Sequence, residues 1–374
     1  MIEKTNLTAI ESLALPGVRG LRPYEPGKPI DELERELGIS DIIKLASNEN
    51  PLGAGQNAIA AIERELVDLA RYPDGNGFAL KQVLAEKHSV TTAEVTLGNG
   101  SNDILELIAR AFVAPENEVV FSQHAFAVYP IVTQAVGAKA VIVPAKNYGN
   151  DLDALLAAVT DKTRVIFVAN PNNPTGSCVT GMDLKTFVAK VPSHVLTVID
   201  EAYFEYAQDL FPGYESAECW LKEYPNLIVT RTFSKAYGLA ALRMGYSLSS
   251  PDIADFLNRV RQPFNVNSLA MAAAVAALAD DEHLENSLAM NRSGLKQYEQ
   301  ACEELGLDYI PTAANFISIN VKQDGRAVFD AMLKKGVIVR PVDNYAMPEF
   351  VRITIGTEPE NKRCIEVLRG VLQG

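Results

Sequence analysis

An α/β protein with a doubly wound, mostly parallel sheet is predicted by the way apolar runs and helical patterns alternate along the chain. Short runs rich in β-branched residues alternate with amphipathic stretches, as in successive βαβ units. These runs are residues 94–97, 118–121, 140–143, 164–168, 195–199 and 227–230. A smaller α+β domain is predicted after residue 265, where one long helical region precedes short strands interleaved with helices. These elements are residues 268–305, 315–321, 337–340 and 350–355.

Before the first of these runs, the chain is predicted to form an extended arm. Four prolines, Pro16, Pro23, Pro26 and Pro29, restrain the backbone there and disfavour a helix. An arm of this kind often reaches a second subunit or covers a site. The predicted division is an N-terminal arm, a large domain and a small C-terminal domain, at residues 1–40, 41–265 and 266–374.

The composition is that of an ordinary globular protein. The 374 residues include 48% hydrophobic and 22% charged side chains, which excludes a disordered chain. The formal net charge of −13 argues against a nucleic-acid-binding surface, which needs clustered Lys and Arg. The alanine-rich run at 270–279 is too short and too weakly apolar to span a bilayer, so no membrane contact is expected.

Cysteine usage and the N-terminus predict a cytoplasmic protein. Cys178, Cys219, Cys302 and Cys364 are scattered without the spacing of metal ligands, so reduced thiols and no metal site are expected. The N-terminus lacks the basic start and continuous apolar run of a signal peptide.

Lys235 is the strongest candidate for catalysis. It follows the apolar run at 227–230, so with Ser234 it falls at the carboxyl end of a strand, where open α/β sheets bind ligands. A lysine amine can form a Schiff base with a carbonyl, and burial lowers its pKa enough to make it a nucleophile and a base. Small neighbours leave room for a flat cofactor, and Arg243 offers a fork of donors for a phosphate. An isolated Ser-Lys pair is usually part of a surface loop, so the other segments decide the interpretation.

Two loops after predicted strands could contribute to the same site. A glycine turn at 98–104 opens a helix whose free N–H groups at Ser101 and Asn102 can hold a phosphate. The alternative is a capped helix without a ligand, because Ser, Asn and Asp are preferred caps. The loop at 169–176 combines two prolines with three asparagines, and a plain turn is its alternative.

A carboxylate and a phenol follow the apolar run at 195–199. Asp200 ends the predicted strand, and Tyr203 comes about one helical turn later. A buried aspartate is rare unless it is paired, so a partner cation is expected. Because the carboxyl ends of parallel strands meet at one edge of the sheet, these segments predict a single ligand crevice.

These four segments, in this order, resemble the pyridoxal phosphate-dependent aminotransferases of fold type I, and the resemblance runs nearly end to end. Several motifs are similar, more narrowly, to the histidinol-phosphate aminotransferases. They lie at residues 44–53, 71–74, 231–238, 258–267 and 352–356. The resemblance implies a homodimer with shared active sites and a step of histidine biosynthesis. In that step histidinol phosphate and 2-oxoglutarate give imidazole acetol phosphate and glutamate, with pyridoxal phosphate as cofactor.

Two alternative functions stay open. Paralogues in this group act on aromatic amino acids or serve as phosphothreonine decarboxylases, so an aromatic amino acid aminotransferase of the same fold is the first alternative. A noncatalytic sensor or binding protein that has kept the fold is the second.

The resemblance also implies roles for the candidate residues. Lys235 would form the Schiff base with the cofactor and then move the substrate's Cα proton, and Asp200 would pair with the pyridine nitrogen. Tyr203 and Asn173 would hydrogen-bond the ring's phenolic oxygen. Phe126 matches the ring that stacks on the cofactor, with simple core packing as the alternative. The cofactor phosphate would be held by Ser101, Asn102, Ser234, Arg243 and, from the neighbouring subunit, Tyr72.

Substrate recognition is predicted to depend on two arginines of the small domain. Arg340 and Arg352 end strands and could each form bidentate pairs with a phosphate or a carboxylate. For Arg340 the alternative is a solvated position at the domain edge. By resemblance, Tyr24 in the arm would close over the substrate and Asn48 would lie near it, although packing in a dimer could also explain both.

Overall fold

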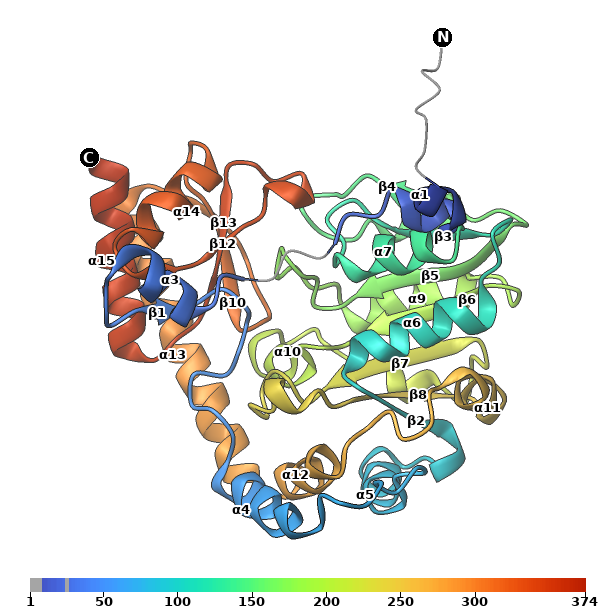
Figure 1. The fold of residues 1–374 in the computed structure, drawn as a ribbon. Helices are drawn as coiled ribbons and strands as arrows, with labels where there is room; N and C mark the ends of the chain where they lie inside the picture. Colours follow the sequence, from blue (N-terminus) through green and yellow to red (C-terminus); the bar gives the residue numbers. More distant parts are fainter. Residues whose placement is uncertain (1–8, 24–26) are drawn as a thin grey trace.

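A seven-stranded sheet forms the centre of the larger part of the molecule. The computed structural model of the protein describes residues 9–23 and 27–374. The strands follow the order β2-β8-β7-β6-β5-β3-β4, and only β8 runs antiparallel to its neighbours. In that order they are Val95–Gly98, Gly245–Ser249, Leu227–Thr232, Leu196–Asp200, Thr163–Ala169, Glu118–Ser122 and Lys139–Val143. The predicted α/β class with a mostly parallel sheet is confirmed (Figure 1).

Helices cover both faces of this sheet, because successive strand residues point to opposite sides and both sides are apolar. Along β5, Val165 belongs to one core cluster and Ile166 to another. The first cluster lies under α6, α7 and α11, which are Ser101–Phe112, Val128–Ala135 and Pro251–Val260. The second includes residues of α5, α9 and α12, which are Phe78–His88, Gly181–Lys190 and Ser268–Leu278. The sheet is therefore buried on both faces, as the continuous apolar runs predict.

The smaller part is an antiparallel sheet with helices packed on it. Its strands follow the order β12-β13-β10-β9, namely Arg340–Pro341, Phe350–Thr354, Phe316–Asn320 and Asp308–Ile310. The helices α14 and α15, Gly325–Leu333 and Glu358–Gln373, share its apolar core with part of α13, Asp281–Leu305. The result is the α+β arrangement predicted for this half of the chain.

The long helix α13 connects the two parts (Figure 1). It begins where the Asp280 side chain accepts a hydrogen bond from the backbone N–H of His283, which satisfies one of the free donors of the first turn. It ends at Gly306, which adopts a left-handed conformation with φ of 63°. Start and stop signals in the sequence thus set the length of this helix.

The N-terminal segment differs from the expected extended arm. Its described residues include three short helices, α1, α2 and α3, at Ala9–Leu13, Pro16–Arg19 and Ile30–Leu37. Pro16 is the first residue of α2, and Pro29 directly precedes α3. A proline is tolerated at these positions because the first N–H groups of a helix have no partner within it. The prolines therefore begin these helices and do not prevent them.

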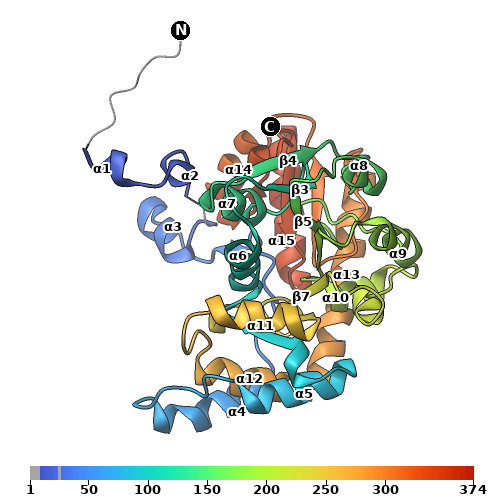
Figure 2. The same ribbon diagram turned by 90° about the vertical axis from the view of Figure 1, so that its right-hand side faces the viewer.

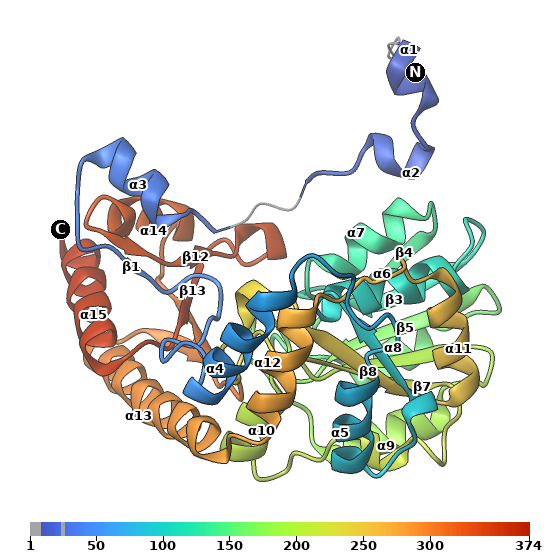
Figure 3. The same cartoon turned by 60° about the horizontal axis from the view of Figure 1, so that its bottom comes forward.

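The packing also divides the chain differently from the predicted residue ranges. The two-residue strand β1, Ile43–Lys44, pairs in parallel with β11, Val337–Ile338, so the start of the predicted large domain packs with the C-terminal part. Conversely, α12 packs against α4, Gln56–Glu65, and its buried alanines belong to the core of the large sheet. Figures 2 and 3 show α4 and α12 side by side, below the sheet in Figure 2.

Candidate active site

A cavity lies at the carboxyl ends of β5, β6 and β7, between the large sheet and the small one. It brings together most of the residues predicted from the sequence. They are Ser101, Asn102, Phe126, Asn173, Asp200, Tyr203, Ser234, Lys235, Arg243, Arg340 and Arg352. Parallel strands place their carboxyl ends at one edge, which explains how residues so far apart in sequence meet here.

Lys235 extends into this cavity from the loop that follows β7. Its Nζ donates a hydrogen bond to the backbone carbonyl of Ser47 at 3.1 Å and lies 5.7 Å from the centre of the Tyr203 ring. Burial, and after it the positive charge of Arg352, lowers the pKa of the Lys235 amine to about 7. A large fraction of the amine is therefore neutral near pH 7, the state that attacks a carbonyl or accepts a proton.

Asp200 is the last residue of β6 and is almost fully buried. Its Oδ2 accepts a hydrogen bond from the Tyr129 hydroxyl at 2.9 Å, and its Oδ1 accepts one from the Thr230 hydroxyl at 3.1 Å. Burial raises the pKa of the Asp200 carboxyl, and these two bonds oppose the rise. Within the part of the chain that the structure describes, no lysine or arginine forms an ion pair with Asp200, so the protein itself does not supply the expected cation. The carboxylate is therefore suited to pair with a protonated ring nitrogen of a bound ligand.

Two amide side chains tie the phenol and the small domain to the cavity. The Asn48 amide donates to the Tyr203 hydroxyl at 2.8 Å, and Arg352 donates to the Asn173 carbonyl oxygen at 2.5 Å. Arg352 also donates to the backbone carbonyl of Ala46 at 2.7 Å, so its guanidinium is held in a fixed orientation. Asn48 itself does not line the cavity and contributes through that hydrogen bond.

The start of α6 provides a site for an anion. Gly100 has a φ of 85°, which lets the chain turn directly into the helix, and Ser101 begins it. A Cβ atom at Gly100 would lie 2.3 Å from the Arg243 guanidinium, and that guanidinium donates to the Ser234 hydroxyl at 3.3 Å. Backbone N–H groups, a helix N-terminus and an arginine therefore converge, which fits a phosphate group.

Phe126 and Arg340 complete the cavity. Phe126 is half-buried, and its ring meets Tyr129 edge to face with ring centres 5.9 Å apart. Arg340 lies on β12 directly opposite Arg352 on β13 in the register of the small sheet. Two guanidinium groups on paired positions suit a ligand with a phosphate or a carboxylate.

Two predicted residues, Asn48 and Tyr72, do not line this cavity. Tyr72 is 82% exposed and stacks on Phe264 with ring centres 4.7 Å apart. Tyr24 lies outside the described residues.

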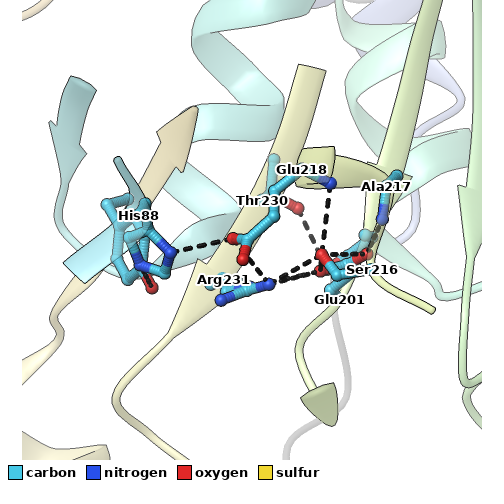
Figure 4. Close-up of polar contacts among 9 residues, drawn as sticks. His88, Glu201, Ser216, Ala217, Glu218, Thr230 and Arg231 are labelled. Atoms are coloured by element: carbon cyan, nitrogen blue, oxygen red, sulfur yellow. Dashed lines mark hydrogen bonds and ion pairs between the residues drawn. The ribbon is translucent and has the colours of Figure 1, made fainter. Parts of the chain in front are cut away.

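Figure 4 shows a buried ionic network that the sequence did not reveal, centred on Arg231. The Arg231 guanidinium is within 2.9 Å of carboxylate oxygens of both Glu201 and Glu218, and it donates to the Ser216 hydroxyl at 2.8 Å. Glu218 in turn lies 2.8 Å from Nδ1 of His88. Glu201 and Arg231 directly follow Asp200 and Thr230, so the network joins the ends of β6 and β7 behind the site.

The sequence carried only a weak signal for these supporting residues. Arg231 and Glu201 adjoin the candidate catalytic residues, but their partners come from distant segments. Tyr129 stands three residues after Phe126, yet nothing local predicts that its hydroxyl reaches Asp200.

Metal-binding clusters and membrane-spanning helices are both absent from residues 9–23 and 27–374. No cluster of His, Cys, Asp and Glu there has the make-up of a metal site. No helix in those ranges combines the length and the apolar character needed to cross a membrane.

Comparison with known proteins gives a consistent result. The family model for aminotransferase class I and II matches residues 40–368. Histidinol-phosphate aminotransferase 2 of Pseudomonas fluorescens strain Pf-5 is 60% identical over 365 residues, which are 96% of this chain and 98% of that protein. Histidinol-phosphate aminotransferase of Methylobacillus flagellatus is 54% identical over 369 residues, 98% of this chain and 99% of that protein.

Solved structures show the same similarity. The histidinol-phosphate aminotransferase of Sinorhizobium meliloti, in complex with pyridoxal-5'-phosphate, superposes with a TM-score of 0.89 at 29% identity, covering 97% of this chain and 98% of that one. A Thermus thermophilus aspartate aminotransferase with maleate, at 22% identity and a TM-score of 0.80, covers 92% of this chain and 97% of that one and shares the fold.

Proposed function

This chain belongs to the class I and II aminotransferase family, and within that family we propose that it transfers the amino group of histidinol phosphate to 2-oxoglutarate. The resemblance noted in the sequence is confirmed by the family model and by relatives that match almost the whole chain. The protein is a pyridoxal phosphate-dependent enzyme. The products of this reaction are imidazole acetol phosphate and glutamate, and the reaction is a step of histidine biosynthesis.

The observation that carries this proposal is the presence of cationic groups at two places in one cavity. Arg243 and the start of α6 suit the phosphate of the cofactor, whereas Arg340 and Arg352 belong to the small sheet. The arginine pair suits an anionic substrate, because guanidinium groups form bidentate pairs with both phosphate and carboxylate. One pocket can therefore accept histidinol phosphate in one half of the reaction and 2-oxoglutarate in the other.

The remaining side chains have roles that their surroundings support. When bound, the cofactor supplies a conjugated, electron-withdrawing ring that stabilises negative charge at the substrate's Cα. The Lys235 amine, with a pKa of about 7, would hold the cofactor through its carbonyl carbon until the substrate amine displaces it, and the freed amine would then accept and return the Cα proton. Asp200 would hold a proton on the ring nitrogen, and Tyr203 and Asn173 would donate hydrogen bonds to the ring's phenolic oxygen. Phe126 would stack on the ring, while Ser101, Asn102, Ser234 and Arg243 would bind the phosphate.

The working unit in this proposal is a cytoplasmic homodimer. Tyr72, Val67 and Phe78 are all more than 60% exposed and lie between β1 and β2 in sequence, which favours a contact surface there. In the dimer Tyr72 would reach the cofactor phosphate of the second copy. All four cysteines are free thiols, which suits a reducing compartment.

A genetic experiment tests the proposed function. A bacterium that lacks its own histidinol-phosphate aminotransferase is transformed with this gene and plated without histidine. Growth is expected for the natural sequence and not for Lys235→Ala. Failure of the natural sequence to restore growth, with soluble protein present, would contradict the proposal.

A further inference from the structure

Tyr129 contacts two of the groups proposed to hold the cofactor ring, although it does not line the cavity itself. It lies on α7 and is almost fully buried. Its hydroxyl donates to Oδ2 of Asp200 at 2.9 Å, and its ring edge meets Phe126 with centres 5.9 Å apart. We propose that Tyr129 is a positioning residue that fixes the Asp200 carboxylate where the ring nitrogen of the cofactor binds. This inference rests on the role proposed above for Asp200.

The ring of Tyr129 is held rigidly, so its hydroxyl has little freedom. It stacks almost parallel on Phe167, with ring centres 4.6 Å apart and an angle of 8° between the planes. The backbone of Tyr129 is also held, because its carbonyl accepts from the Thr133 hydroxyl at 2.7 Å and its N–H donates to the Phe126 carbonyl at 3.0 Å. A donor fixed in this way sets the direction from which the carboxylate is held.

The two hydroxyls that reach Asp200 come from different elements and bind different oxygens. Tyr129 on α7 binds Oδ2, and Thr230 on β7 binds Oδ1. Together they fix the plane of the carboxylate, which has more lone pairs than these two bonds use and can accept a further bond from a ligand. Burial raises the pKa of Tyr129 well above its ordinary value, so the phenol keeps its proton and always acts as the donor.

The hydrogen bond also bears on the charge of Asp200. Burial, and to a smaller extent the charge of Glu201, raises the pKa of this carboxyl, and the bond from Tyr129 is the largest of the effects that lower it again. The other titratable groups that face Asp200 are Tyr203, Lys235 and the neighbouring Glu201. Removing the phenolic O–H leaves these groups in place and takes away one bond that favours the ionised carboxylate.

The test is an equilibrium titration of the cofactor-free protein with pyridoxal phosphate, in which protein fluorescence reports binding. The titration is repeated at pH values between 5.5 and 8.5, a range of about three units around neutrality. Tyr129→Phe keeps the ring and its packing but removes the O–H. We expect cofactor binding to weaken about tenfold, the order of effect for one hydrogen bond to a charged group. We also expect the loss of binding at low pH to begin at a higher pH, because the pKa of Asp200 rises. Tyr298→Phe, which removes a buried hydroxyl in the core of the small domain, should leave cofactor binding unchanged.

A double-mutant cycle shows whether Tyr129 acts through Asp200. Asp200→Ala alone should weaken cofactor binding strongly, and adding Tyr129→Phe to it should cause almost no further loss. The same tenfold loss in both backgrounds would overturn the inference, because Tyr129 would then act by packing alone. Wild-type affinity and pH dependence in Tyr129→Phe would also overturn it. Unchanged affinity in Asp200→Ala would instead remove the proposed role of Asp200 and this inference with it. Thermal unfolding of each cofactor-free variant checks that the variants are folded.

Discussion

Asn48 donates a hydrogen bond from its side-chain amide to the hydroxyl of Tyr203 at 2.8 Å, although 155 positions separate the two residues. The backbone N–H of Asn48 also donates to the Thr354 hydroxyl at 2.9 Å. The segment after β1 therefore links a phenol of the large domain to the last strand of the small sheet. The proposed partner of the cofactor's phenolic oxygen is in this way fixed from outside the cavity.

Replacing Asn48 by Ala should lower kcat/KM about tenfold, because Tyr203 loses the hydrogen bond that orients it. The pKa of Tyr203, about 12 and raised mainly by burial, should rise further, since the Asn48 bond lowers it. Steady-state kinetics with saturating cofactor measure the effect. Asn226→Ala is a matched control, because that amide donates to the Val195 carbonyl at the other end of the strands. Equal losses in the two variants would contradict a specific role for Asn48.

The stability of the cofactor-free protein should depend on pH through Lys235. The pKa of this amine is about 7 in the folded protein and has an ordinary value of 10.5. Between these values the unfolded chain binds more protons at this position, so the contribution of Lys235 to the free energy of unfolding rises with pH. The slope is at most about 1.4 kcal/mol per pH unit. The destabilisation is complete below pH 7 and disappears as the pH approaches 10.5.

Urea unfolding at several pH values between neutrality and about two units above it measures this slope. Lys235→Met removes the titrating amine, so the variant should be the more stable protein near neutrality, and the difference should shrink as the pH rises. Parallel stability curves for the two proteins would show that the amine is not perturbed.

Arg352→Lys should raise the KM for glutamate about tenfold or more with a smaller change in kcat. Lysine keeps the positive charge but loses the planar fork that binds a carboxylate with two hydrogen bonds. It also loses the orientation given by the bonds to Asn173 and Ala46. Arg164→Lys serves as the control, because Arg164 lies at the start of β5 and donates to the nearby carbonyls of Asp161 and Thr163. An unchanged KM in Arg352→Lys would place substrate recognition elsewhere.

Mixing two inactive variants should restore activity if the active sites are shared. In a dimer with shared sites, Tyr72→Ala would remove a phosphate contact from the site of the partner subunit. Lys235→Ala would disable the site of the subunit that carries it. A mixed dimer has both defects in one site and none in the other. After subunit exchange, roughly a quarter of the wild-type activity is expected, since half of the dimers are mixed. Activity no greater than that of the separate variants would contradict a site shared through Tyr72.

The fold and the centre of the cavity could be predicted from the sequence because their signals are local. Asp200 ends one apolar strand and Lys235 lies in the loop that follows the next, and the topology of a parallel sheet then brings them together. The short helices of the N-terminal segment were missed because a proline favours the first turn of a helix as readily as it disfavours the interior.

Long-range polar contacts could not be predicted in this way. Nothing in the sequence near Tyr129 indicates that its hydroxyl reaches Asp200, and nothing near His88 indicates the ion pair with Glu218. The partners of these groups are chosen by the packing of whole elements, which a pattern of apolar residues specifies only coarsely. The assignment of α12 to the large domain has the same cause, because its alanines would suit either core.

The most direct test of the account is the first half of the reaction, followed by the change in visible absorbance of the bound cofactor. The purified protein is mixed separately with histidinol phosphate, phenylalanine and glutamate in single-turnover experiments. Fast conversion with histidinol phosphate and glutamate, and slow conversion with phenylalanine, is the predicted result. Fast conversion with phenylalanine and little with histidinol phosphate would contradict the account and identify an aromatic amino acid aminotransferase.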